Sequence, residues 1–423
     1  MSVDNSELLM LLGGKKVKYT IGVQGKIGFG GGLYGGDPAD LKAIGLSPMP
    51  NNDNPTNENY GSYIHTNGSV MLFIPAFCYR IGRAGAPSYI RDGANALEIR
   101  DAGLGEGDGW ILHRAFIDGD VKKSGFFIDK YLCSKDSTGD IAISIKKGSP
   151  IATSTMFNFS NSMPDCLGKP LDAITLSRAR GEAYACVSAF QWSAIAMLSL
   201  AHGQATNSTK DCAWFDPEYT TNFPKGNNSR SLTDVDDPSV SFTRDSNNYG
   251  TTCLTGSASD LAKTTHTGQI WGITDINGNM FQPLLGLMQL DGFRAAKESV
   301  KMHDFTKDNC TKISMFEAPV SGCGEGSGKC FGQNKNQVFF TETSGPGRAL
   351  CGVVPTAIGY SSGGKQLFGY DYGGYGNNVS YPVFASGFYG DVASAGIWYR
   401  NGANSSWSTN EYNGGFRAAG YPP

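Results

Sequence analysis

The chain has 423 residues, a formal net charge of −3 and 40% hydrophobic residues. This length fits one large domain or two or three ordinary ones, and the hydrophobic content suffices for a buried core. The charge gives no electrostatic case for a nucleic-acid partner, because no basic stripe runs along the sequence. No segment approaches the roughly 20 apolar residues of a membrane-spanning helix, so we expect no membrane insertion. With 57 glycines and only 17% charged residues, many loops and few long helices are expected.

The first residues lack the pattern of an export signal. In MSVDNSELLMLLGGKK, acidic residues precede the short apolar run and basic residues follow it, which is the reverse of a signal peptide. The ten cysteines include no CxxC pair and no histidine partner at metal-ligand spacing. Cys323 and Cys330 flank a glycine-rich turn and could form a disulfide. Most of the other cysteines are expected to be free buried thiols, since nothing indicates secretion.

Residues 1–60 are expected to be an extension attached to a main domain at residues 61–423. Val17 to Gly32 alternates apolar and small residues, which predicts one or two strands. Asp37 to Tyr60 is rich in Pro, Asn, Asp and Gly, which predicts a linker or an irregular loop. Two interpretations of the extension stay open: an attachment segment, or an addition to the edge of the fold.

The main domain begins with two segments that are typical of strands. Val70 to Pro75 is a short apolar run that ends at proline, which predicts a buried strand. Gly125 to Lys135 is dense in aromatic and β-branched residues, which also favours a strand.

Two helices are predicted between Leu176 and Gly203. Ser177 is the expected cap of the first helix, whose apolar positions recur at three- and four-residue spacing as far as Val187. The second helix is expected from about Gln191 to Ala201. It is apolar almost all round, which predicts that it is buried. Residues 204–265 are polar and are expected to form loops.

No pattern of catalytic residues is found along the chain. GxSxG, Walker A and HExxH motifs are absent from the sequence. The histidines are scattered and are interpreted as surface or structural residues rather than general bases: His65, His113, His202, His266 and His303. Asp234, Asp236 and Asp237 lie close together, but the glycine and distal glutamate of a calcium loop are missing, so a solvated acidic turn is expected. We therefore predict no catalytic site and no cofactor.

Residues 295–364 are interpreted as an insertion, with short strand candidates at Gln337–Phe340 and Cys351–Val354. The segment that follows is rich in tyrosine. Seven of the nineteen tyrosines and two of the six tryptophans lie between residues 370 and 412, among Asn, Ser and Gly. This is the composition of an antibody-like binding surface, in which Tyr and Trp supply contact area and the small polar residues supply adaptable hydrogen bonds. A glycine-rich loop region of an irregular β protein is the alternative interpretation.

The motif GGFRAAG at Gly414–Gly420, preceded by the run Ser394–Tyr399, resembles the C-terminus of the variable proteins of diversity-generating retroelements. These carry a C-type lectin fold of the kind seen in formylglycine-generating enzymes. Four further segments resemble that fold: Val70–Pro75 with Phe77 and Arg80, the F-x-I-D-x-Y pattern within Gly125–Lys135, the turn Phe223–Asn227, and Trp271–Gln282. The chain departs from the enzyme pattern at Ala189–Ser193, at Lys225 and at Gln282.

The resemblance implies an α+β chain with the C-type lectin fold of the formylglycine-generating-enzyme-like subtype: two helices, a mixed or antiparallel sheet and long loops. In relatives, oxygens near the 271–282 segment can help hold Ca²⁺. Gln282 replaces the acidic position here. We therefore favour a turn at Asn277-Gly278 that satisfies itself by side-chain-to-backbone hydrogen bonds over a structural Ca²⁺ site.

The resemblance also divides the C-terminal region into fixed and diversified positions. The fixed positions would shape the loops and tie them to the core: Gly387, Ala395, Gly396, Trp398, Gly415, Phe416 and Arg417. Phe416 and Arg417 are expected in a terminal strand, with Phe416 buried and Arg417 bonded to nearby carbonyls or a carboxylate. The predicted ligand-binding positions lie in the hypervariable region at about 370–413: Tyr370, Tyr372, Tyr375, Asn377, Asn378, Phe388, Tyr389, Asp391, Ala393, Tyr399, Asn401, Ala403, Asn404, Ser406, Ser408, Asn410 and Tyr412.

The sequence thus predicts a non-enzymatic binding protein that displays a diversified surface to a host-cell-surface ligand or another protein. The lack of an export signal favours a virion location, such as a tail fibre, or the cytoplasm before assembly, with the N-terminal segment as a virion attachment. One alternative is an oxidative enzyme of the formylglycine-generating type. Those enzymes bind copper through a cysteine pair near the C-terminus, whereas Cys351 is the only cysteine in the last ninety residues of this chain. The other alternative is a structural virion protein of fixed specificity.

Overall fold

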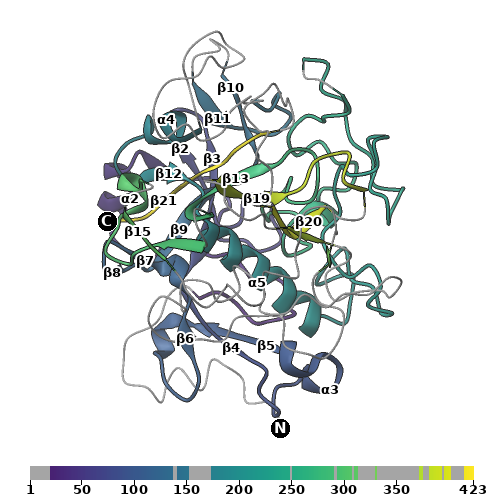
Figure 1. The fold of residues 1–423 in the computed structure, drawn as a ribbon, viewed down its shortest axis with the longest axis horizontal. Coiled ribbons are helices and arrows are strands. Elements are labelled where there is room, and N and C mark those ends of the chain that lie inside the picture. Colours follow the sequence, from purple (N-terminus) through teal and green to yellow (C-terminus); the bar gives the residue numbers. More distant parts are fainter. Residues whose placement is uncertain are drawn as a thin grey trace.

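The structure is a computed structural model of the chain. It describes residues 20–136, 141–151, 173–247, 250–289, 293–306, 309–312, 329–330, 371–374, 381–392, 395–401 and 414–423. The described chain is a mixed α+β protein with few helices and mainly antiparallel sheets (Figure 1). The α+β class predicted from the sequence is therefore confirmed.

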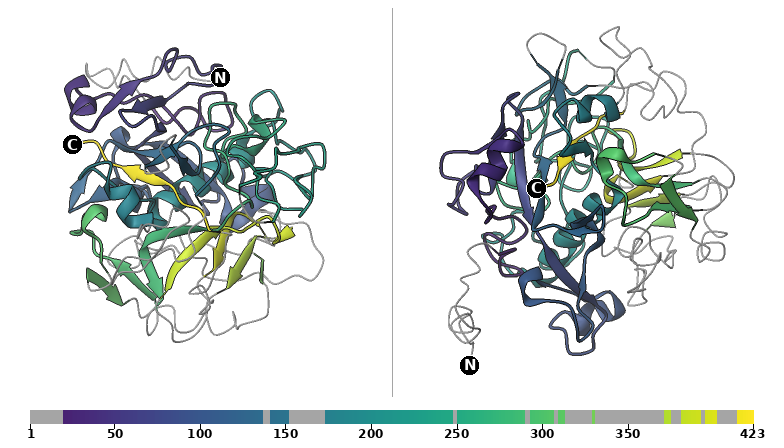
Figure 2. Two further views of the ribbon diagram at one scale, coloured as in Figure 1. Left: turned by 90° about the horizontal axis from the view of Figure 1, so that it is seen from above. Right: turned by 90° about the vertical axis from the view of Figure 1, so that its left-hand side faces the viewer.

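A six-stranded antiparallel sheet joins the two ends of the described chain. Its order is β1 (Leu46–Pro48), β2 (Ser62–His65), β3 (Val70–Pro75), β9 (Gly125–Asp129), β21 (Ala418–Gly420) and β12 (Tyr184–Cys186). The predicted strands at β3 and β9 are confirmed, and Phe73 lies opposite Phe127 in their register. The last strand of the chain is inserted between β9 and β12, as the yellow arrow in Figure 2 shows.

A second sheet carries the described parts of the Tyr-rich region. Its seven strands follow the order β15 (Cys310–Lys312), β14 (Phe293–Ala296), β13 (Gln282–Gln289), β19 (Tyr381–Ser386), β20 (Gly396–Asn401), β18 (Tyr372–Gly374) and β16 (Lys329–Cys330). β18 and β20 are parallel, and the other neighbours are antiparallel. Both views of Figure 2 place this sheet on the side of the molecule opposite the purple N-terminal strands.

Smaller elements complete the fold. A three-stranded sheet of β5 (Leu97–Asp101), β4 (Phe77–Ile81) and β6 (Ile111–Leu112) forms the lower lobe in Figure 1. Two hairpins add β7 (Ile117–Asp118) with β8 (Val121–Lys122), and β10 (Cys133–Lys135) with β11 (Ala142–Ser144). The short helices are α2 (Pro38–Ala43), α3 (Tyr89–Asp92) and α4 (Ala173–Arg178), with 3₁₀ turns η1 (Gly93–Asn95), η2 (Ala102–Leu104), η3 (Arg114–Phe116), η4 (Ala262–Thr264) and η5 (Met302–Asp304).

The long helix α5 (Ala189–Ala205) is the centre of the core. Its first turn is closed by a capping box, in which the Ser188 hydroxyl accepts from Gln191 N and the Gln191 side chain accepts from Ser188 N. The helix is buried almost all round and contacts β5, β13 and β20. The prediction of a buried helix is confirmed, with four more residues at its C-terminal end and two more at its N-terminal end.

The first predicted helix is wrong in its extent. Helix α4 ends at Arg178, and Tyr184–Cys186 is the strand β12. Ser177 is not a cap, because it lies inside α4 and its hydroxyl donates to Ala173 O. Gly181, at φ +126°, adopts a backbone that L side chains rarely adopt, and beyond it Ala185 pairs with Ala419 of the terminal strand. Pairing with a distant strand therefore overrides the local helical periodicity.

The described N-terminal residues form part of the main core. Residues 20–32 contain turns rather than the predicted strands. Phe29 is fully buried, and its ring stacks on His202 with centroids 5.5 Å apart. One core cluster extends from Ile21 to Tyr421, so the two ends of the described chain share an interior.

The predicted free buried thiols are confirmed for five cysteines: Cys78, Cys133, Cys186, Cys212 and Cys253. Cys323 and the strand candidates at 337–340 and 351–354 lie outside the described residues, as does the side chain of Cys330. The predicted loop character of residues 204–265 is confirmed for the described part that follows α5, where the one regular element is η4.

Candidate functional site

The GFRAA segment is tied to the core through one arginine. Arg417 is fully buried, and its guanidinium donates to Asp129 O (3.0 Å), Lys130 O (3.1 Å) and Asp275 O (3.0 Å), to Thr274 O and to Gln282 Oε1 (2.7 Å). These acceptors come from the last residue of β9 and the residue after it, from the segment that precedes β13, and from the first residue of β13. The predicted burial of Phe416 and carbonyl bonding of Arg417 are confirmed, although both residues directly precede β21 instead of lying within it.

Two segments that were compared separately with the lectin-type fold interlock in space. Asn279 N donates to Asn227 O (2.7 Å), and Asn228 Nδ2 donates to Asn277 Oδ1 (3.1 Å). Asn279 Oδ1 also accepts from Cys253 N (2.9 Å). The prediction that the Asn277-Gly278 turn satisfies itself is wrong, because the Asn277 side chain bonds to a distant segment: its Nδ2 donates to Pro224 O (2.7 Å). Among the described residues, no three His, Cys, Asp or Glu side chains are grouped so that they could hold a metal ion.

Strand β20 packs against a buried carboxylate. Asp371 is buried and accepts from Trp398 N (2.6 Å), and burial raises its pKa well above the usual range. A methyl group at Gly396 would overlap the Asp371 carboxylate, so this position requires glycine. Trp192 of α5 donates from its indole N–H to Ile397 O (2.8 Å). The backbone of β20, which carries part of the predicted binding region, is therefore held by Asp371 and Trp192.

An aromatic cluster fills the space between this backbone and the surface. Phe281, Phe384 and Tyr399 are buried, and the partly buried Phe388 packs on them. The Phe281 and Phe388 rings lie 5.0 Å apart, and the Phe388 and Tyr389 rings lie 5.1 Å apart. Tyr399 is only 3% exposed, so its ring belongs to the interior of the cluster.

Asp391 closes the loop between β19 and β20. Its carboxylate accepts from Phe388 N (3.1 Å) and interacts with the Tyr399 side chain. Burial raises the pKa of Asp391 to about 7. The conformation of this loop thus depends on a carboxyl group that changes charge near neutral pH.

A second loop, which the sequence analysis missed, packs against the first. Arg230 N donates to Tyr389 O (3.0 Å), and the Arg230 guanidinium donates to Gly390 O. The Tyr389 hydroxyl lies against Gly250, where a side chain would overlap it. The described residues of this polar stretch, 229–247 and 250, thus form one side of the site. The composition of the stretch is that of an ordinary loop, and no spacing in the sequence links it to Tyr389.

The structure brings four of the predicted binding side chains together: Phe388, Tyr389, Asp391 and the buried Tyr399. For Tyr372 and Asn401 it describes the backbone alone, in the neighbouring strands β18 and β20. The other predicted positions lie outside the described residues: Tyr370, Tyr375, Asn377, Asn378, Ala393, Ala403, Asn404, Ser406, Ser408, Asn410 and Tyr412.

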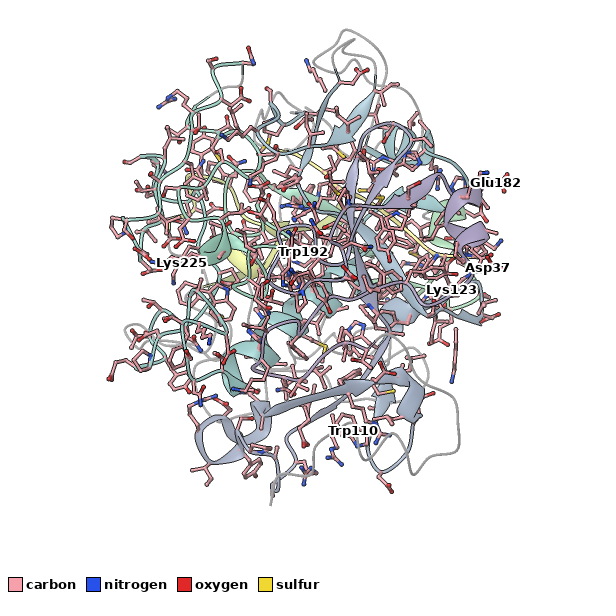
Figure 3. All side chains as sticks on the ribbon, turned by 180° about the vertical axis from the view of Figure 1, so that it is seen from behind. Asp37, Trp110, Lys123, Glu182, Trp192 and Lys225 are labelled. Atoms are coloured by element: carbon pink, nitrogen blue, oxygen red, sulfur yellow. The ribbon has the colours of Figure 1, made fainter. Side chains whose placement is uncertain are left out.

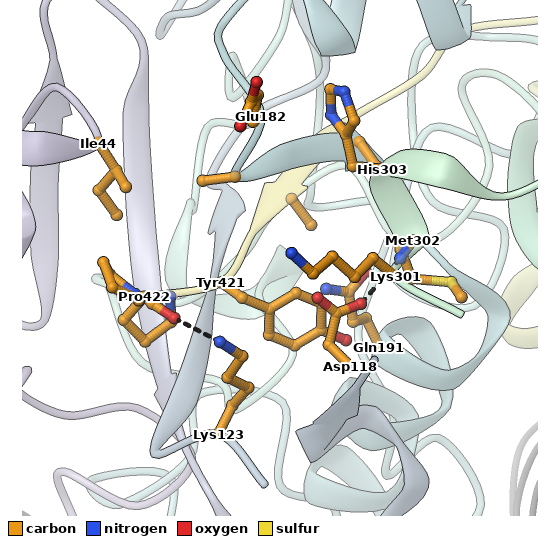
Figure 4. A pocket seen from close by; sticks show the side chains of 14 residues that line it. Ile44, Asp118, Lys123, Glu182, Gln191, Lys301, Met302, His303, Tyr421 and Pro422 are labelled. Atoms are coloured by element: carbon orange, nitrogen blue, oxygen red, sulfur yellow. Dashed lines mark hydrogen bonds between the residues drawn. The ribbon is translucent and has the colours of Figure 1, made fainter. Parts of the chain in front are cut away.

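A small pocket lies elsewhere, where β12, η5 and the C-terminal residues meet (Figure 4). Its volume is about 190 Å³. Lys123 donates to Pro422 O (3.2 Å), and Asp118 accepts from Met302 N (2.8 Å). Figure 3 places Lys123 and Glu182 on the side of the molecule opposite Lys225, which neighbours the interlocked turn. The lining carries lysines and carboxylates in balance, and none of the predicted binding residues lines it.

The buried titratable groups of the described core have structural roles. Burial lowers the pKa of His202 to about 4 and that of His266 to about 3, and each ring bonds to a backbone carbonyl oxygen. Burial also raises the pKa of the Cys133 and Cys253 thiols well above the ordinary value. A buried neutral imidazole and a protonated thiol are poor groups for acid–base or nucleophilic chemistry.

In comparison with known proteins, no protein-family model matches the chain and no curated protein has a matching sequence. Among the described helices, none is both long and apolar enough to cross a membrane. The site is therefore interpreted from its own geometry and from the resemblance of its motifs.

Proposed function

We propose that this chain is a non-enzymatic ligand-binding protein that displays a diversified surface at about residues 370–413. Its fold would be the C-type lectin fold of the kind seen in formylglycine-generating enzymes. The chain would be the variable protein of a diversity-generating retroelement. The observation that carries the proposal is the division of the site into two layers. The residues assigned as fixed are buried or conformationally required, as at Gly396, Trp398 and Arg417. Of the predicted diversified positions that the structure describes, Phe388 and Tyr389 are only partly buried, whereas Tyr399 is buried beneath them in the cluster with Phe281.

A fold can tolerate many amino-acid replacements at the predicted diversified positions only if the residues that hold its backbone are separate from those positions. Arg417 and Asp371 bond to backbone atoms and not to side chains of the predicted diversified positions. Replacement of loop side chains would therefore leave these anchors intact. A protein surface of Tyr, Ser, Asn and Gly on such a frame suits recognition of varied protein targets.

The target class in this proposal is a host-cell surface or another protein, and the location is a virion surface such as a tail fibre. Display of several copies would raise a moderate affinity by avidity. In this proposal the N-terminal segment would serve as the attachment, and its described part would be held to the body through Phe29 and β1.

Sequencing of the 3′ part of this gene across a population tests the proposal. Amino-acid replacements should concentrate at the predicted positions within 370–413, with Gly396, Trp398 and Arg417 unchanged. Replacements spread evenly over the gene would contradict diversification. A copper-dependent oxidation of thiol substrates by the purified chain would instead support the enzyme alternative.

A further inference from the structure

Two neighbouring parts of the polar stretch after α5 lie beside Tyr389, which is distant from them in the sequence. The first contains Arg230, whose guanidinium donates to Gly390 O from Nη2 (3.1 Å) and Nε (3.3 Å). The second contains Arg244, which donates from Nη1 to Gly250 O (2.6 Å). Because the Tyr389 hydroxyl lies against Gly250, the two arginines flank this tyrosine. We call Arg230, Arg244, Phe388 and Tyr389 the arginine–tyrosine patch.

The backbone around the arginine–tyrosine patch is held in uncommon conformations. Arg230 has φ +63°, Leu232 has φ +60° and Val392 has φ +55°. Non-glycine residues rarely adopt this region, and for a β-branched valine it is a clear outlier. Such conformations persist where the surrounding structure imposes them, and they cluster at binding sites. Here they fix the position of Arg230 against the 387–392 loop.

Both arginines are exposed, and neither forms an ion pair with another residue that the structure describes. Their hydrogen-bond acceptors among the described residues are carbonyl oxygens, which orient the guanidinium groups without neutralising them. The Asp391 carboxylate does feel the charge of Arg230, which acts to lower its pKa against the larger effect of burial. Asp391 accepts from Phe388 N, and Asp245 accepts from Ser149 Oγ (2.8 Å). The patch therefore presents two oriented guanidinium groups beside aromatic rings, with one neighbouring carboxyl group, Asp391, whose pKa is raised to about 7.

We propose that the arginine–tyrosine patch binds a carboxylate-bearing segment of a protein partner, and that Arg230 and Arg244 are a fixed part of the binding surface. This inference rests on the proposed function, because it assigns a partner class to the same surface. Oriented guanidinium groups bind carboxylates through paired hydrogen bonds, and arginine and tyrosine are enriched among the residues that dominate protein interfaces.

An acidic protein segment fits the patch better than a polyanion does. Nucleic acids and sulfated polysaccharides require an extended basic surface. The chain has a net charge of −3, and the patch supplies two positive charges. Two guanidinium groups beside two aromatic rings suit a short segment in which one or two carboxylates neighbour an aromatic or apolar side chain.

Fluorescence anisotropy with the full chain tests this inference. The probes are labelled peptides of alternating Glu and Tyr, and matched peptides in which Gln replaces every Glu. We expect the wild-type chain to bind the Glu peptide about tenfold more tightly than the Gln peptide. The double variant R230Q/R244Q should lose this preference. The control K42Q/K210Q removes two exposed lysines elsewhere and should keep it.

Two further variants separate the effect of charge from that of guanidinium geometry. R230K/R244K retains the charges without the paired geometry, and R244Q alone leaves the Arg230 contacts intact. We expect both R230K/R244K and R244Q to bind the Glu peptide less tightly than wild type. If R230Q/R244Q does not fold, these two variants test the role of the arginines in its place. Equal binding of both peptides by the wild-type chain overturns the inference, as does binding of dextran sulfate without any peptide preference. Diversification at 370–413 without a peptide preference would remove this inference and leave the proposed function standing.

Discussion

Arg417 offers the sharpest test of how the candidate site is held. Its guanidinium supplies five hydrogen bonds to four backbone carbonyls and Gln282. In R417M five acceptors lose their donor, at about 1–3 kcal/mol for each buried group left unsatisfied. Part of this loss is offset, because burial of the guanidinium is itself unfavourable, as its lowered pKa indicates. We expect R417M to lower the free energy of unfolding by about 3–5 kcal/mol.

Urea unfolding followed by tryptophan fluorescence measures this change. The midpoint should fall in R417M while the slope with urea is retained. R244M is the matched control, because Arg244 is exposed and bonds to one carbonyl. We expect the control to change the free energy of unfolding by less than about 0.5 kcal/mol. If the free energy of unfolding of R417M lies within about 1 kcal/mol of the wild-type value, the change is on the order of that of the control. Arg417 would then not hold the site together.

Three other predictions concern the frame beneath the loops. G396A should lower the free energy of unfolding by about 3 kcal/mol, because its methyl group would overlap the Asp371 carboxylate; an unchanged urea midpoint would rule out that contact. The raised pKa of Asp391, about 7 in the folded chain against the ordinary 3.8, means that the folded state holds this proton more tightly. The contribution of Asp391 to the stability of the folded chain is complete below about pH 4 and is lost as the pH rises through about 7. The variant D391N should therefore gain thermal stability relative to wild type as the pH rises between these two values. Parallel profiles of melting temperature against pH for the two chains would contradict this. Cys133 and Cys253 are fully buried, so Ellman's reagent should reach them only after unfolding, and their rapid labelling in the native chain would contradict the packing.

Several elements could be predicted from sequence because their signals are local. The strand at Val70–Pro75 is a continuous apolar run, and α5 combines strong helix formers with a Ser188 cap. The burial of Phe416 and the carbonyl bonding of Arg417 followed from the nature of these side chains next to an apolar segment. In each case the residues that define the structure lie within a few positions of one another.

The errors have a common physical cause, which is pairing across long separations. β12 was predicted as helix because its partner β21 lies more than two hundred residues away, and only that pairing makes Tyr184–Cys186 extended. The site has the same property. Arg230 and Gly390 are 160 residues apart, and no local pattern indicates that a polar loop will support Tyr389. Tyr399 belongs to the Tyr-rich segment that was predicted to form the binding surface, but its ring is buried in the cluster with Phe281.

The central claim is that the loops at about 370–413 are diversified over a fixed frame. The most direct measurement is the DNA sequence immediately downstream of this gene. The account predicts a near-copy of the codons for about 370–417, differing almost only where the copy has adenine, beside a reverse transcriptase gene. Such a copy would also name the diversified residues, and Gly396 and Arg417 should not be among them. If the downstream DNA holds no such copy, the Tyr-rich surface is a binding site of fixed specificity and the diversification claim is wrong.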